Sequence, residues 1–87
     1  MEILDMALND FGSLVKHLRV KKGWTLEQLG EKAGYTSSFI LRIEQKKRNP
    51  TLESRLAVLI SLEVPDEIII KYVQQVISNK KGYEKVV

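Results

Sequence analysis

The sequence predicts an all-α fold, with five helices packed around one core in a single small domain. Three observations support this prediction. Apolar residues recur at three- and four-residue spacing in five successive segments, capping residues and glycines separate those segments, and no segment alternates apolar and polar residues as a strand does. The 87 residues, 44% hydrophobic and 29% charged, suit one folded core and leave no room for a second.

The first helix is predicted over residues 11–22. Asn9 or Asp10 can cap its start, and two lysines followed by Gly23 suit its end. Its apolar positions lie on one face, as in an amphipathic helix. They are Phe11, Leu14, Val15 and Leu18.

Two short helices follow in close succession. Thr25 stands three residues before a glutamine, which is the pairing of a capping box, and the helix that starts there ends at Gly34. Thr36 or Ser37 can cap the next helix, predicted over residues 37–45. Two short helices joined by a tight turn that contains glycine have the sequence form of a helix-turn-helix.

Pro50 and Thr51 mark the start of a fourth helix, in which leucines recur as far as Leu62. Pro65 and Asp66 then stop that helix and start a fifth one, predicted from residue 67 to about residue 79. Its apolar residues cover more than one stripe, which is wider than a single core contact requires. Residues 80–87 show no clear period and are expected to form a flexible, frayed tail, and residues 1–10 an N-terminal extension.

The positive charge is concentrated in the middle of the chain. Residues 11–50 hold nine basic and three acidic side chains, a net charge of +6, whereas residues 1–10 sum to −3 and residues 51–87 to zero. Such a segment favours a polyanionic partner. The alternative is an ordinary solvated surface, because charge alone says little about the target.

From Phe11 to Val64, about two-thirds of its length, the chain resembles the Xre/Cro-CI family of helix-turn-helix DNA-binding domains. The matching residues are Phe11-Gly12, Leu18-Arg19, Gly23, Thr25, Leu29, Gly34, the string Ile40-Leu41-Arg42-Ile43-Glu44, and Arg48-Asn49-Pro50. The resemblance implies a five-helix fold, with a DNA-binding domain over residues 11–64 and a C-terminal helix over residues 65–79, whose second and third helices read double-stranded DNA as a dimer. The size of the chain and its apolar last helix also resemble small phage-repressor-like or restriction-modification controller-like regulators.

Specific readout needs side chains that reach base edges in the major groove, chiefly from the start of the reading helix. With Tyr35, Ile40 and Ile43 packed inward, the polar flank of that helix faces outward. At positions that match the family, the outward residues meet bases or phosphates; they are Thr36, Ser37, Ser38, Phe39 and Arg42. An arginine can bond to guanine and a phenylalanine can contact a thymine methyl group, the alternatives being a phosphate contact for Arg42 and a core position for Phe39. The sequence departs from the family at Leu41, where a polar residue is common.

Phosphate contacts are expected at two places. Thr25 and the first N–H groups of its helix can bind one phosphate. In the family, the loop after the reading helix contacts phosphates of the second DNA strand. That loop consists of Lys46, Lys47, Arg48 and Asn49. A cap alone at Thr25 and a merely solvated loop are the alternatives. Leu26 replaces a glutamine often seen in the family, which removes one phosphate contact.

The family match also implies an ion pair between Arg19 and Glu44, which would fix the angle of the reading helix. The alternative is that the two residues are unrelated surface charges. Trp24 and Tyr35 are expected to be core anchors.

We expect no enzyme, cofactor or metal site. His17 is the only histidine and has no second ligand at helical spacing, and the chain has no cysteine. No unbroken apolar run, Ile68 to Ile70 included, approaches the roughly 20 residues of a membrane-spanning helix. We therefore expect a cytoplasmic protein without a membrane partner.

A single reading helix touches few bases, so we expect a homodimer on a two-fold site. The expected interface lies in residues 65–79, whose apolar side chains divide between the chain's own core and a partner copy, with Ile3, Leu4 and Leu8 assisting. These side chains are Ile69, Ile70, Tyr72, Val73, Val76 and Ile77. The alternative is that all of these residues cover the chain's own core.

These observations predict a sequence-specific transcriptional regulator, a repressor that occupies a promoter or a protein that contacts RNA polymerase. The alternative from another class is a protein-interaction module, such as an adaptor or antitoxin subunit, whose basic surface is incidental.

Overall fold

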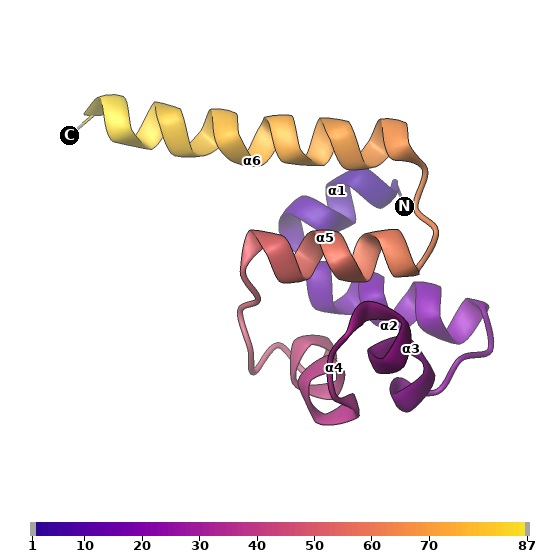
Figure 1. Ribbon diagram of the computed structural model, residues 1–87. Coiled ribbons are helices and arrows are strands. Elements are labelled where there is room, and N and C mark those ends of the chain that lie inside the picture. The colour runs from indigo at the N-terminus through magenta and orange to yellow at the C-terminus, as the bar shows by residue number, and fades with distance from the viewer. Residues whose placement is uncertain (1, 87) are drawn as a thin grey trace.

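A computed structural model describes the backbone of residues 2–86 and the side chains of residues 2–80. Within this range every regular element is a helix, so the all-α prediction is confirmed. The helices are α1 (Ile3–Asn9), α2 (Phe11–Lys21), α3 (Leu26–Ala33), α4 (Ser37–Glu44), α5 (Leu52–Ser61) and α6 (Asp66–Val86) (Figure 1). The structure therefore has one helix more than the sequence predicts.

The additional helix is α1, which occupies the segment that was expected to be an extension. It packs against α2 and α6, and Ala7 is buried in the core. Ile3, Leu4 and Leu8 also pack on the chain's own core. The sequence did not reveal this helix because its seven residues make only two turns and no side chain caps its start.

Side chains cap the other short helices where the sequence predicts caps. Asp10 accepts from the Ser13 N–H, Thr36 from the Phe39 N–H, and Thr51 from the Ser54 N–H. Thr25 and Gln28 form the predicted capping box, with N···O distances of 3.0 and 2.8 Å. These caps set the starts of α2 to α5 within a residue of their predicted positions.

Two glycines shape the packing of α4. Gly34 caps the end of α3 with a φ of 83°, a left-handed conformation that only glycine adopts at little cost, and this turns the chain into α4. Gly12 lies where α2 crosses α4, and a methyl group there would collide with the carbonyl oxygen of Ile43. The absence of a side chain at Gly12 thus sets the close approach of the two helices.

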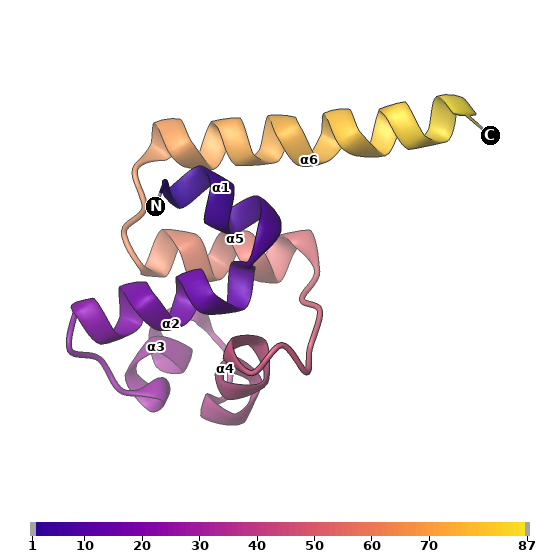
Figure 2. The same ribbon diagram turned by 180° about the vertical axis from the view of Figure 1, so that it is seen from behind.

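The last helix, α6, is longer than predicted, because it continues to Val86 instead of ending near residue 79. The segment expected to be a frayed tail is helical as far as the described backbone extends. Helix α6 packs on α1 and α5, at the end of the molecule away from α3 and α4, and its C-terminal part projects beyond the other helices (Figures 1 and 2). No helix in the described part of the chain is long and apolar enough to cross a lipid bilayer.

All six helices contribute to the core, which is formed mainly by aliphatic side chains. Its fully buried members are Leu14, Val15, Leu29, Ile40, Ile43, Val58 and Leu59, together with Tyr72. The ring of Tyr72 stacks on Phe11, with the ring centroids 6.5 Å apart. Through this contact α6 is joined to the start of α2.

Candidate nucleic-acid interface

Helix α4 turns its polar flank to solvent. Ile40 and Ile43 are 0% and 1% exposed, which fixes the rotation of the helix. On the opposite flank, Ser37, Ser38 and Arg42 are exposed, as is the capping residue Thr36. Because α3 and α4 lie at one end of the molecule, no other helix covers this flank (Figure 1). The predicted outward orientation of these four residues is therefore present.

Phe39 lies at the edge of this flank and is half-buried. Its ring stacks on Tyr35 with the ring centroids 4.6 Å apart, and the guanidinium of Arg48 lies 5.3 Å from the Phe39 centroid. The Tyr35 hydroxyl bonds to Ser54 on α5 at 2.9 Å. Phe39 thus packs on the chain's own aromatic ring at Tyr35 and also lies near a cation of the following loop.

A two-point ion pair holds the end of α4. Arg19 Nε and Nη2 donate to the two carboxylate oxygens of Glu44 at 2.7 and 3.0 Å, and Nη1 donates to the Trp24 carbonyl oxygen at 2.8 Å. The side chains are 13% and 3% exposed, so the pair is largely shielded from water. Hydrogen bonding to Glu44 raises the pKa of Arg19 above its usual value. The predicted pair is confirmed, and it also brings the residue before Thr25 close to the end of α4.

The N-terminus of α3 lies next to this pair. Both the hydroxyl and the backbone N–H of Thr25 are used within the capping box. The N–H groups of Leu26 and Glu27 belong to the first turn, in which no carbonyl group of the helix can accept from them. Thr25 thus acts as the cap of α3, and these two backbone N–H groups lie beside it at the positive end of the helix.

The loop of residues 45–50 folds back on α4. The backbone N–H groups of Lys47 and Arg48 both donate to the Arg42 carbonyl oxygen, at 2.9 and 3.2 Å, and both side chains are exposed. Lys46 has a φ of 61°, a left-handed conformation that is uncommon for a residue with a side chain. Its ammonium lies 3.1 Å from an Asp10 carboxylate oxygen, so part of its charge is already neutralised.

A family model described as Helix-turn-helix matches residues 15–65, more than half of the chain. The chain belongs to this helix-turn-helix family, which is of the Xre/Cro-CI type. No curated protein and no solved structure gives a significant match. As a member of the family, the protein is a DNA-binding regulator, and such domains are typically not enzymes.

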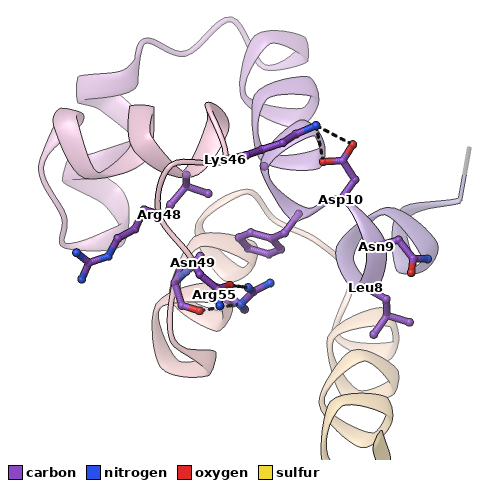
Figure 3. A pocket seen from close by; sticks show the side chains of 11 residues that line it. Leu8, Asn9, Asp10, Lys46, Arg48, Asn49 and Arg55 are labelled. Atoms are coloured by element: carbon purple, nitrogen blue, oxygen red, sulfur yellow. Dashed lines mark hydrogen bonds and ion pairs between the residues drawn. The ribbon is translucent and has the colours of Figure 1, made fainter.

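Within this helix-turn-helix protein, Asn49 has a different setting from the other predicted loop residues. Its side-chain oxygen accepts a hydrogen bond of 2.5 Å from Arg55 Nη2 (Figure 3). Arg55, on α5, was not among the predicted site residues. The one available signal was its position between leucines at three- and four-residue spacing, where a charged side chain needs a partner.

Two carboxyl groups near the helix-turn-helix are stabilised in their charged form. Hydrogen bonding to Ser13, and then to Lys46, lowers the pKa of Asp10 below its usual range. Hydrogen bonding to Lys22 lowers the pKa of Glu63 in the same way, through a contact of 2.6 Å. His17 is exposed on α2, beside Lys16 and Val20.

Helix α6 carries the predicted interface residues on two faces. Tyr72 is 2% exposed and belongs to the chain's own core, so its assignment to a partner surface is corrected. Ile69 and Val76 are half-buried and also pack on the core. In contrast, Ile70 and Ile77 are 56% and 43% exposed, and the half-buried Val73 lies between them along the helix.

Proposed function

We propose that this protein is a sequence-specific transcriptional regulator that reads a two-fold operator in double-stranded DNA as a homodimer. In this proposal residues 11–64 form the reading domain and the α6 helix supplies the dimer contact. The regulator acts by occupying a promoter, as a repressor does, or by contacting RNA polymerase.

The observation that carries this proposal is the outward polar flank of α4, held at a fixed angle by the Arg19–Glu44 pair. Specific readout is favoured when the side chains are already ordered in the free protein, because the conformational entropy lost on binding weakens the complex. Two buried isoleucines and a shielded ion pair remove most of that freedom from α4. The flank therefore has the rigidity that a reading surface needs.

The exposed residues of this surface suit different groups of the DNA because their side chains differ in chemistry. Arg42 suits a bidentate bond to the N7 and O6 of guanine, and the ring edge of Phe39 suits a thymine methyl group. Ser37 and Ser38 add bonds that discriminate less, because a hydroxyl group both donates and accepts. Backbone N–H groups at the start of α3, and the side chains of Lys47 and Arg48, bind phosphates and set the position of the protein on the duplex.

The dimer is supported by the two stripes of α6. One stripe packs on the core, whereas Ile70, Val73 and Ile77 form a second stripe with spacings of three and four residues. A second copy of the same helix is the occupant that matches such a repeating apolar surface, because an isologous interface is self-complementary. A partner seated there leaves α4 free, since the two helices lie at opposite ends of the molecule.

Fluorescence anisotropy with a pool of labelled random duplexes and a salt titration tests whether the helix-turn-helix binds DNA through this surface. Binding by several phosphate contacts predicts that affinity falls steeply with salt, by about one logarithmic unit of slope per contact. Arg42→Ala is expected to weaken binding about tenfold, whereas Lys71→Ala, which removes an equal charge from exposed α6, is not. Equal binding by both variants, or no duplex binding at low salt, would contradict the proposal.

A further inference from the structure

Arg55 joins three parts of the molecule that are far apart in the sequence. Its Nε donates to the Pro50 carbonyl oxygen at 2.9 Å, its Nη2 to Asn49 at 2.5 Å, and its Nη1 to the Tyr72 hydroxyl at 3.3 Å. Its guanidinium carbon also lies 4.9 Å from the centroid of the Phe11 ring. One side chain of α5 thus contacts the end of the loop, the start of α2 and the middle of α6.

The acceptors that Arg55 contacts carry no formal charge. Its hydrogen bonds go to a backbone carbonyl, an amide oxygen and a phenol, and its fourth contact is an aromatic face. Only a planar guanidinium, with N–H groups directed along its edges and a flat face for the ring, can make all four contacts at once. A lysine at this position would keep the charge and lose most of the geometry.

The loop held by Arg55 is the one that carries the exposed cations of the proposed phosphate contact. Arg42 fixes the start of this loop through the N–H groups of Lys47 and Arg48, and Arg55 fixes its end through Asn49 and Pro50. Figure 3 shows that the Arg48 side chain is directed away from Arg55. Because the two attachments adjoin in the sequence, they leave few conformations to residues 47–50.

We propose that Arg55 is a positioning residue that holds the loop of residues 45–50 in its DNA-binding conformation without touching DNA. This inference rests on the proposed function for its effect on binding, but not for its effect on the loop itself. Because Arg55 also contacts Tyr72, the conformation of the loop is linked to the packing of α6 on the rest of the molecule. The proposal assigns to Arg55 a role that differs in kind from that of Lys47 and Arg48, although all three are cations.

The effect on the loop is tested in the free protein by amide hydrogen exchange measured by nuclear magnetic resonance. In Arg55→Met, the Lys47 and Arg48 amides are expected to exchange about tenfold faster, whereas the amides of Leu29 and Ile40 in α3 and α4 keep their rates. Arg55→Lys is expected to behave like Arg55→Met, since the geometry and not the charge is lost. Unchanged loop exchange in both variants, or restoration by lysine, would overturn the proposal.

If Arg55→Met lowers overall stability too far for this comparison, Asn49→Ala serves instead. It removes the shortest contact of Arg55 from an exposed position and leaves the packing of Arg55 on Phe11 in place. The expected change is the same increase in loop exchange, smaller in size. Exchange equal to that of the wild-type chain in this variant also counts against the proposal.

The effect on DNA binding is tested by a double-mutant cycle with the random-duplex pool. Arg48→Ala is expected to weaken binding about fivefold in the wild-type chain but less than about twofold in the Arg55→Met background, because the loop is already misplaced there. Thr25→Ala, which removes the cap beside the other phosphate contact, is the control and is expected to weaken binding by the same factor in both backgrounds. Additive effects of Arg48→Ala and Arg55→Met would overturn the positioning role.

These readouts separate this inference from the proposed function. If the wild-type protein binds no duplex DNA, the proposed function fails, and the exchange experiment still decides whether Arg55 holds the loop. If the protein binds DNA and the cycle shows no coupling, only the role of Arg55 is wrong.

Discussion

Arg19 connects α2 to both helices of the helix-turn-helix through hydrogen bonds. It bonds to Glu44 at the end of α4 and to the carbonyl group just before α3 begins, so both short helices depend on it. The pair is partly buried, and in such a place the cost of removing water from two charges offsets much of their attraction. Its main effect is therefore on the geometry of α4 and less on net stability.

A double-mutant cycle measures this directly. Arg19→Met and Glu44→Gln are each expected to lower the free energy of unfolding by about 3 kcal/mol, because each leaves a buried group without its partner. The double variant is expected to lose less than the sum of the two, by at least about 1 kcal/mol. The measurement is urea denaturation followed by circular dichroism, and additive losses would show that the two side chains do not act as a pair.

Asp10 places a negative charge beside the loop that follows α4, since its carboxylate lies against Lys46. Asp10→Asn keeps a good capping residue for α2 and releases that ammonium. Duplex binding is expected to become about twofold tighter at low salt, with the difference fading as salt screens the charges. Glu67→Gln, which removes an exposed carboxylate from α6, is the control and is expected to leave affinity unchanged.

The same carboxyl group predicts a pH effect on stability. Its pKa is lowered in the folded chain, so its contribution is present above the pKa of the unfolded chain and is lost as the pH falls through the lower folded value. In acid titrations of thermal unfolding, Asp10→Asn should therefore lose less stability than the wild-type protein over that interval. Parallel curves for the two proteins would contradict the assignment.

At the scale of the elements, Gly12 controls how closely α4 can approach α2. A methyl group there would meet the Ile43 carbonyl oxygen, so Gly12→Ala must push the two helices apart. We expect a loss of about 1–3 kcal/mol in the free energy of unfolding, in spite of the better helix propensity of alanine. Lys16→Ala, on the exposed flank of the same helix, should cost almost nothing; a Gly12→Ala protein as stable as this control would show that the crossing is not tight.

The sequence was sufficient to predict the elements that begin with a side-chain cap. Thr25, Thr36 and Thr51 all cap the helices expected to follow them, because such signals lie within three residues of their effect. Helix α1 has no such cap, and its identity as a helix depends on packing against α6, more than 50 residues away. The end of α6 was also predicted too early, since its sequence beyond residue 79 shows no apolar period.

The site could be predicted only in part for a similar reason. The exposed flank of α4 follows from helical spacing, and the Arg19–Glu44 pair from the family match. The contact between Asp10 and Lys46 joins residues 36 apart in sequence, and Arg55 meets Tyr72 only because α5 and α6 pack together. Such contacts depend on the tertiary arrangement, which residue spacing does not encode.

For the whole molecule, the central feature is the separation of two surfaces. The polar flank of α4 lies at one end of the molecule and α6, with its exposed stripe, lies at the other, and the loop after α4 leads away from that end to α5 (Figure 1). This arrangement lets two copies associate through α6 and still present both α4 helices. For a helix-turn-helix dimer, the two half-sites are then expected about one turn of DNA, or roughly 34 Å, apart.

The dimer contact is tested by sedimentation at micromolar concentration. Ile70→Lys is expected to convert the dimer to a monomer, because it places a charge in the middle of the apolar stripe. Ile60→Lys is a matched control, since Ile60 is 62% exposed on α5 and lies outside that stripe. A wild-type protein that sediments as a monomer, or an Ile70→Lys variant that remains dimeric, would contradict the interface.

Selection from random duplexes followed by sequencing tests the central claim most directly, namely that α4 reads base edges. The wild-type protein is expected to enrich a two-fold-related sequence, and Arg42→Ala to lose the preference at one base pair in each half-site while keeping the rest. If no sequence is enriched, or if Arg42→Ala enriches the same sequence with the same preferences, then α4 does not read DNA in the way described.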